Sequence, residues 1–270
     1  MNSAHKPITA QGKKPAPTNP RIMYSLWSLS LSGLLAFFAL QSFYPNLIGP
    51  ASNVLPSVCV GVMLWSALKC VSRYGPSLKK RFQAAWAMFS LGAGLWLVAE
   101  LTWAFYYFYL NDSVPYPSVA DVFYVAGYVP MLLGLAFYLK VFAPGMTAKR
   151  LAVATSMIVA ATAAVIAFVV PPEFAMSEPL VQRATDIAYP VLDLALLAIA
   201  LLAIAIFFGG SLSRWLVIFG GAATAYIVAD ELFLYQVASG TYVNGGVDDF
   251  IFLIGYMLFG LAFYEHRRRL

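Results

Sequence analysis

The sequence predicts an all-α integral membrane protein, and three observations lead to this fold class. Hydrophobic residues make up 61% of the 270-residue chain, charged residues make up only 11%, and the mean hydropathy is +0.76. Soluble domains of this size do not have such a composition. The apolar runs are long enough to cross a hydrocarbon core of about 30 Å, and they are separated by turns rich in Pro, Gly and Asn.

Eight apolar runs predict eight transmembrane helices. Their expected bounds are Tyr24–Tyr44, Ser52–Val71, Phe82–Leu110, Ala120–Phe142, Leu151–Val170, Thr185–Phe208, Trp215–Val237 and Asp249–Glu265. Residues 1–22 precede them and are polar, basic and rich in proline, which predicts a disordered tail. The first run lacks a small-residue cleavage site, so we expect it to be retained as a signal anchor.

The lysines and arginines predict the orientation of the chain. Such residues stay in the cytoplasm when they flank transmembrane segments, and here they occur in the N-terminal tail, after every second span and in the C-terminal run Arg267-Arg268-Arg269. Arg183 is the exception. We therefore expect an inner or plasma membrane protein with both termini in the cytoplasm. The net charge of +5 then belongs to a surface that faces anionic lipid, so the bilayer is an expected partner and nucleic acid is not.

An internal repeat predicts that the protein consists of two four-helix halves, residues 23–144 and 145–270. The segment Trp96–Glu100 resembles Tyr226–Asp230, and Asp121–Tyr128 resembles Asp249–Tyr256. Because each half has an even number of spans, the halves share one orientation and form a parallel pseudo-repeat about an axis along the membrane normal. Chance similarity between apolar helices is the alternative.

Carboxylates within or beside the apolar runs predict where the polar chemistry lies. In the expected topology all of them fall in the outer half of the membrane: Glu100, Asp121, Asp186, Asp193, Asp230, Glu231, Asp248 and Asp249. A carboxylate in hydrocarbon costs about 3 kcal/mol or more, so these groups normally face a bundle interior or a watery cavity. The sequence therefore predicts a polar site on the outer side.

Aromatic residues flank the deepest acids at helical spacing, and together they form the candidate ligand-binding set. Its members are Glu100, Asp193, Asp230, Glu231, Trp96, Trp103, Tyr107 and Tyr226, with Asp121, Tyr128, Asp249 and Tyr256 as secondary candidates. An acid within an aromatic wall holds a cation by charge and by the ring quadrupole. The expected partner is thus a small cationic ligand or a hard cation such as Ca²⁺.

Structural roles stay open for the same residues. Asp121, Asp248 and Asp249 begin helices, where acids act as caps and interact favourably with the helix dipole. The outer tyrosines and tryptophans suit an interfacial belt. The deep acids suit a hydrogen-bond network between the two halves.

Few residue types are present that would support cofactor binding or catalysis. The two histidines, His5 and His266, lie at the polar ends of the chain, which argues against a haem or a His-rich zinc site. Cys59 and Cys70 lie on one predicted helix and cannot bond to each other there. No cofactor and no catalytic residue is evident, and no Ser/His/Asp arrangement or nucleophile motif indicates an enzyme.

The run Pro115–Tyr128, with its Pro-Ser-x-Ala-Asp-x-Phe-Tyr core, carries a resemblance to a known family, together with Glu100 before it and Ala188–Asp193 after it. It resembles the multi-spanning N-terminal sensory modules that precede GGDEF/EAL or histidine kinase domains in prokaryotes. The resemblance implies a membrane sensory module. No output domain follows Leu270 in this chain, so a signal is expected to pass to a separate partner.

Three function classes follow from these observations. A sensor or binding module with an outward-facing carboxylate and aromatic pocket ranks first. A cation- or proton-coupled transporter suits a pseudo-symmetric bundle with acids near the midplane, although the inner half offers no matching charges. An intramembrane enzyme that uses paired acids ranks last.

Overall fold

The computed structural model describes residues 20–110, 115–142, 179–207, 209–210 and 213–269, with isolated positions between 152 and 163. Seven helices in this part of the chain are long and apolar enough to cross a membrane. They are α1 (Pro20–Ala39), α2 (Pro45–Tyr74), α3 (Arg81–Phe105), α4 (Val119–Phe142), α7 (Leu180–Phe207), α8 (Ser213–Ala238) and α9 (Val247–Arg269). The all-α, multi-pass membrane fold that the composition predicts is confirmed for these residues.

The helix bounds differ from the predicted ones at starts and at ends. Helix α1 begins at Pro20, within the expected disordered tail of residues 1–22, and ends at Ala39, five residues before the expected Tyr44. Helix α2 begins at Pro45, seven residues before the expected Ser52, because proline suits the first position of a helix, where its missing N–H is not needed. A short 3₁₀ turn, η1 (Gln41–Phe43), precedes it, and α3 continues as a π-helical turn, η2 (Tyr106–Leu110). The fifth expected span, Leu151–Val170, lies almost entirely outside the described residues, so the count of eight spans stays a prediction.

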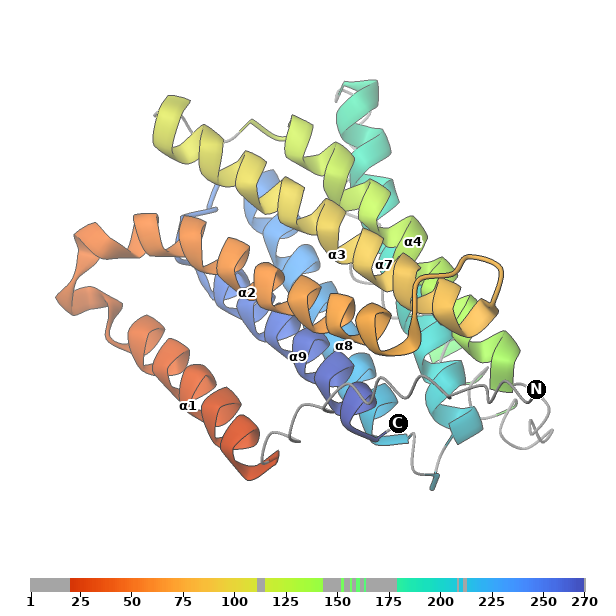
Figure 1. Ribbon diagram of the computed structural model, residues 1–270. Coiled ribbons are helices and arrows are strands. Elements are labelled where there is room, and N and C mark those ends of the chain that lie inside the picture. Colours follow the sequence, from red (N-terminus) through yellow and green to blue (C-terminus); the bar gives the residue numbers. More distant parts are fainter. Residues whose placement is uncertain are drawn as a thin grey trace, which may run out of the picture.

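Six helices form a closed ring in the order α2, α3, α4, α7, α8, α9, in which each helix packs on the next and α9 packs on α2. Helix α1 lies outside this ring and contacts α9 (Figure 1). The outward faces carry exposed apolar side chains, for example Leu29, Val62, Val122, Val191 and Val217. Such a surface suits lipid rather than water.

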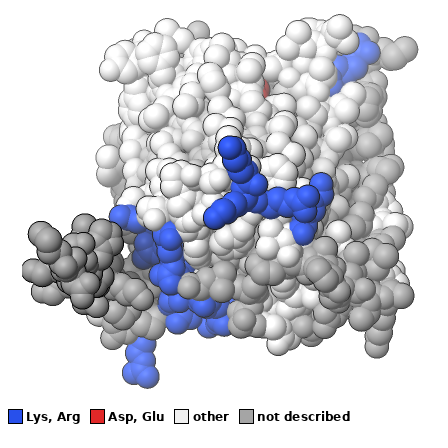
Figure 2. Space-filling view, turned by 45° about the vertical axis from the view of Figure 1, so that its right-hand side comes forward, with Lys and Arg blue, Asp and Glu red and all other residues white. Residues whose placement is uncertain are grey.

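The helices alternate in direction, so α1, α3 and α8 begin at the end of the bundle where α2, α4, α7 and α9 finish (Figure 1). We call this the basic end, because nearly all described Lys and Arg residues belong to it: Arg21, Lys69, Arg73, Lys79, Lys80, Arg81, Lys140, Arg214, Arg267, Arg268 and Arg269. Figure 2 shows these side chains mainly on the lower half of one face. Arg183, at the start of α7, lies at the opposite end.

Aromatic side chains fill the centre of the ring between the two ends. We call this set the aromatic core: Trp86, Phe89, Trp215, Phe219, Phe259 and Phe263, all fully buried. The rings of Trp86 and Trp215 lie 6.0 Å apart and those of Phe89 and Phe219 lie 5.9 Å apart. Each such pair contributes about 0.5–1.5 kcal/mol beyond its buried area. In lipid, where apolar burial alone does not drive helix association, this packing holds the ring together.

Two glycines let α3 and α4 approach each other closely. A Cβ on Gly127 would collide with the ring of Trp96, and a Cβ on Gly92 would lie 2.6 Å from Cγ of Met131. Small residues at helix crossings in membranes allow this approach. The position of Trp96 therefore depends on the absence of a side chain at residue 127.

His266 is not at a polar end, as its sequence position suggests, but is fully buried. Helix α9 continues to Arg269, four residues beyond its expected end, and His266 faces the ring interior, whereas Arg268 and Arg269 after it are exposed. Its Nδ1 lies 3.2 Å from the Tyr74 hydroxyl group and its Nε2 lies 3.0 Å from that of Tyr138. A neutral imidazole has one donor and one acceptor nitrogen, so two hydroxyl groups satisfy it completely.

Candidate binding site

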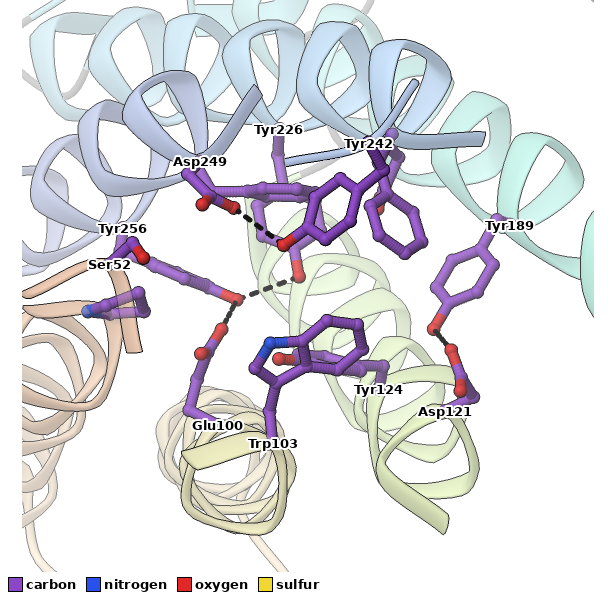
Figure 3. Close-up of a pocket in the computed structure, with 14 residues that line it drawn as sticks. Ser52, Glu100, Trp103, Asp121, Tyr124, Tyr189, Tyr226, Tyr242, Asp249 and Tyr256 are labelled. Atoms are coloured by element: carbon purple, nitrogen blue, oxygen red, sulfur yellow. Dashed lines mark hydrogen bonds between the residues drawn. The ribbon is translucent and has the colours of Figure 1, made fainter. Parts of the chain in front are cut away.

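A cavity opens between the helices at the end away from the basic end (Figure 3). Its lining combines four carboxyl groups with eight aromatic rings: Ser52, Pro56, Glu100, Trp103, Asp121, Tyr124, Tyr189, Tyr226, Asp230, Phe233, Tyr242, Asp249, Phe252 and Tyr256. The cavity offers about 60 Å³ to the centres of water molecules. One water needs on the order of 10–15 Å³ on that measure, so a few waters or one small ligand fit.

Glu100 of α3 is held by tyrosines of both halves of the chain, Tyr256 of α9 and Tyr124 of α4. The Tyr256 hydroxyl group donates to Glu100 Oε1 at 2.6 Å, and it lies 3.0 Å from the hydroxyl group of Tyr226 (Figure 3). The carboxyl group is buried, with 7% of the residue exposed. A carboxylate can accept about four hydrogen bonds, so it retains acceptor capacity toward the cavity.

Asp121 has a structural role and also lines the cavity. It accepts from the backbone N–H and the hydroxyl group of Ser118, at 2.6 and 2.9 Å, and the Ser118 hydroxyl oxygen accepts from the N–H of Ala120. This reciprocal arrangement is a capping box that fixes the first turn of α4. The other carboxylate oxygen accepts from the Tyr189 hydroxyl group at 2.7 Å, so the cap also joins α4 to α7.

Asp249 occupies the corresponding place at the start of α9. Its Oδ2 accepts from the backbone N–H of Gly245 at 2.6 Å, and its Oδ1 lies 3.5 Å from the Tyr242 hydroxyl group. Gly245 has a φ of 84°, a left-handed conformation that favours glycine. Burial and the nearby Asp249 raise the pKa of Tyr242 above its usual value, so this hydroxyl group stays a hydrogen-bond donor.

Asp230 and Asp193 form a pair that shares one tyrosine. The Tyr128 hydroxyl group lies 2.6 Å from Asp193 Oδ1 and 2.9 Å from Asp230 Oδ2, and the two carboxyl groups lie within hydrogen-bonding reach of each other. Asp230 faces the cavity, whereas Asp193 lies behind it and is fully buried. The pair joins α4, α7 and α8 at one point.

Two stacked rings close the cavity on the side of the aromatic core. The rings of Trp96 and Tyr226 lie 4.8 Å apart and are parallel within 4°. The indole N–H of Trp96 donates to the carbonyl oxygen of Tyr124 at 3.0 Å, which fixes the orientation of its ring. Tyr226 therefore lines the cavity with one face and covers Trp96 with the other.

The candidate residues from the sequence fall into three groups. Those that line the cavity are Glu100, Asp230, Trp103, Tyr226, Asp121, Asp249 and Tyr256. Asp193, Tyr128 and Trp96 lie directly behind this lining and contact it. Glu231 and Tyr107 do not line the cavity, because Glu231 follows Asp230 by one residue and so points to a different face of α8, and Tyr107 belongs to η2 beyond the end of α3.

Sequence reasoning missed the tyrosines Tyr124, Tyr189 and Tyr242 as cavity residues. Two of them had a usable signal: Tyr124 lies one turn after Asp121, and Tyr189 lies one turn before Asp193 on the same helix. Tyr242 had none, because it belongs to the connection between α8 and α9, whose path no periodicity predicts.

Within the part of the chain that the structure describes, no Lys or Arg side chain lines the cavity, so no basic residue of this lining neutralises its acids. Among the described residues, no three His, Cys, Asp or Glu side chains converge closely enough to hold a metal ion. Comparison of the chain with protein-family models, with curated proteins and with solved structures finds no match.

Proposed function

We propose that this protein is a multi-pass membrane binding module, a sensor that takes up a small organic cation in the cavity and signals through a separate partner. The observation that carries the proposal is the lining itself, which within the described part of the chain has four carboxyl groups, eight aromatic rings and no Lys or Arg. Aromatic rings and carboxylates attract cations together, and acids inside a membrane mark ligand sites.

The hydrogen bonds explain why the acids favour a cation although each already has a partner. Tyr256, Tyr189, Tyr242 and Tyr128 supply hydroxyl donors to the lining acids, and none of them carries a positive charge. Hydroxyl donors reduce the cost of burying a carboxylate but leave its charge uncompensated. A bound cation would supply the missing charge.

The oxygen atoms available in the lining favour an organic ammonium group over a hard metal ion. Ca²⁺ needs six to eight oxygen ligands, and no metal-binding group of His, Cys, Asp or Glu side chains is found within the described ranges. An ammonium group needs only a few acceptors. Besides the carboxylates, the carbonyl group of Ser52 is suited to this role, because Pro56 has no N–H to donate to it.

The expected orientation directs the cavity to the outside of the cell. The cavity lies away from the basic end, and basic flanking residues stay in the cytoplasm. Fusion of a cytoplasm-active reporter after Leu270 should give a signal, whereas the same reporter inserted at Asn244 should not. Activity of a periplasmic reporter at Leu270 would contradict this orientation.

The aromatic core favours binding over transport. Between the stacked pair of Trp96 and Tyr226 and the buried His266, the described residues at the centre of the ring are mainly apolar, and many of them are aromatic. Alternating-access transporters keep the site at the interface of their repeats and open it to either side. A cation would have to cross this core to leave toward the basic end, which makes a coupled transporter the second candidate.

The contacts across the cavity support two similar halves related by a pseudo-two-fold axis. In the proposed repeat Trp96 is equivalent to Tyr226, and these two rings stack on each other. Tyr256 donates to Glu100, and the equivalent Tyr128 contacts the equivalent Asp230. The ring of helices is also unchanged when α2, α3 and α4 are exchanged with α7, α8 and α9.

The test is stabilisation of the purified protein by a panel of amines. Methylammonium, tetramethylammonium, n-butylammonium and choline are compared with a neutral analogue such as n-butanol, because a ligand that binds the folded state raises the midpoint of thermal unfolding. We expect at least one cation, and no neutral analogue, to stabilise the wild type. Asp230→Asn should remove the effect and Glu265→Gln, at the basic end, should retain it.

Uptake into vesicles separates the two candidate functions. The stabilising cation should not accumulate in proteoliposomes under a proton or sodium gradient. Gradient-driven uptake would contradict the sensor and favour the transporter, and stabilisation by neutral and charged analogues alike would contradict a cation site.

A further inference from the structure

Asp193 and Asp230 differ from the other acids of the site because their carboxylate oxygens have too few hydrogen-bond donors. The Tyr128 hydroxyl group has one hydrogen and lies within bonding distance of both carboxyl groups. Oδ2 of Asp193 has no partner as long as both acids are ionised, although this side chain is fully buried. A buried acceptor without a partner costs about 1–3 kcal/mol, and more when it is charged.

One additional proton resolves this deficit. Two carboxyl groups within hydrogen-bonding reach form a bond when one of them is protonated. With a proton on Asp193, its O–H donates to Asp230, and the Tyr128 hydroxyl group supplies the second hydrogen of the network. Two like charges at such short range do not both ionise readily, so a shared proton also lowers the charge that the membrane interior must hold.

In the described ranges of the chain, no Lys, Arg or His lines the cavity beside the pair and could replace this proton. Among the described residues, the titratable groups that interact with the pair or line the cavity beside it are acidic or phenolic: Tyr189 on α7, Asp121, Tyr124 and Tyr128 on α4, Tyr226 and Glu231 on α8, Glu100 on α3, Asp249 and Tyr256 on α9, Tyr116 in the segment before α4 and Tyr242 in the segment before α9. Arg183, on the same helix as Asp193, lies ten residues earlier, about 15 Å along the axis.

We propose that Asp193 holds this proton and thereby directs the single negative charge of the pair to Asp230, the member that lines the cavity. The proposal rests on the proposed function, because it assigns the charge that a cation in the cavity would meet. Asp193 is a positioning residue: it touches no ligand and acts through Asp230. The bound cation and the charge on Asp230 then neutralise each other, and the proton stays on Asp193.

The proposal predicts effects of very different size for two substitutions of the same chemical type. Asp193→Asn replaces the protonated acid by an amide that also donates to Asp230, so binding of n-butylammonium should persist within about 3-fold. Asp230→Asn removes the charge from the cavity, and the affinity should fall by at least about 30-fold, as expected for the loss of a charge-assisted hydrogen bond. A purely structural role for the pair predicts similar effects of the two substitutions.

The pH response provides a second readout. In the wild type, alkaline pH removes the shared proton and adds a negative charge beside the cavity, so the affinity for n-butylammonium should rise. In Asp193→Asn no such proton exists, and the rise should be absent. Equal pH profiles of the two proteins would overturn the proposal.

Infrared spectroscopy tests whether the pair carries a proton. It needs no ligand, so its result is informative even if no amine binds. At neutral pH the wild type should show a carbonyl band of a protonated carboxyl group that is absent from Asp193→Asn, with elution as a monodisperse species as the check on folding. An unchanged band would overturn the shared proton. If the band is absent from Asp193→Asn but no amine binds to the wild type, the proton on Asp193 is supported and the proposed cation site is refuted.

Discussion

The two ends of the bundle bury carboxyl groups in opposite ways. At the basic end, Glu265 is fully buried and accepts from Tyr24, while the guanidinium groups of Arg214, Arg268 and Arg269 approach its Oε1 to 3.7, 3.0 and 2.6 Å. At the cavity, Glu100 has tyrosine hydroxyl groups as partners and no basic residue in the lining. The first acid is neutralised within the protein, and the second is not.

From this difference we expect Glu265 to have a structural role and Glu100 to be available to a ligand. An ion pair with several arginines needs no further cation, and the arginines reach solvent at the membrane surface. An acid whose partners are hydroxyl groups has no cationic partner within the protein, so we expect it to attract a cationic ligand. The residue type alone does not distinguish these cases, but the partners do.

The largest effect on stability is expected for Tyr128→Phe. This substitution removes the hydroxyl group that both Asp193 and Asp230 contact, at a cost of about 1.5–3 kcal/mol for a hydrogen bond to a charged group. The midpoint of thermal unfolding in detergent should fall clearly. Tyr235→Phe is the matched control, because that tyrosine is 62% exposed on the same bundle; an equal fall in both variants would contradict the role assigned to the network.

Gly127→Ala should have the next largest effect, because it tests whether the cavity depends on packing beneath it. The added methyl group meets the Trp96 ring, and overpacking of this kind costs about 1–3 kcal/mol. Gly221→Ala is the control, since its Cβ meets nothing within 4 Å and alanine favours the helix. A stabilising Gly127→Ala would mean that Trp96 is free to move and does not hold the stacked pair in place.

Glu265→Gln should cost less than about 1 kcal/mol, although the substituted residue is buried. The arginine side chains that surround it are 53%, 32% and 27% exposed, so water can solvate them when the carboxylate is lost. Unfolding midpoints at low and high salt measure this contribution, which screening should reduce further. A loss as large as that of Tyr128→Phe would remove the distinction between the two ends.

The smallest effect concerns alkaline pH and the Tyr242 hydroxyl group. Its pKa in the folded protein lies above the unfolded value of about 10, so its contribution to stability is complete below pH 10 and is lost as the pH rises above it. The unfolding midpoint of Tyr242→Phe should therefore decline less steeply above pH 10 than that of the wild type. Parallel curves would place Tyr242 in a more polar environment than its burial indicates.

The sequence predicts the membrane-spanning helices well, because hydropathy and length are properties of each helix on its own. The described helices begin and end within five residues of the expected bounds, except that α2 begins at Pro45, seven residues before the expected Ser52. Acids in apolar runs likewise indicate that a polar site exists, since their burial needs an explanation wherever the helices pack.

The partners of these acids are the part that sequence reasoning could not supply. Tyr256 and Glu100 are 156 residues apart, and Tyr128 and Asp230 are 102 apart, so no local pattern joins them. Sequence reasoning also did not predict which face of a helix turns inward near a polar helix end. His266 follows a charged residue and precedes three arginines, yet it is fully buried.

The most direct measurement of the central claim compares the reaction rates of a cysteine in the cavity with a cationic and an anionic thiosulfonate reagent. Cys59 and Cys70 are first replaced by alanine, and Ser52→Cys then places a thiol in the lining. An uncompensated negative cavity concentrates cations, so the cationic reagent should react much faster, and Asp230→Asn or Glu100→Gln should reduce the ratio. Equal rates for both reagents, or a ratio that neither substitution changes, would contradict the claim that these acids present a free negative charge to a ligand.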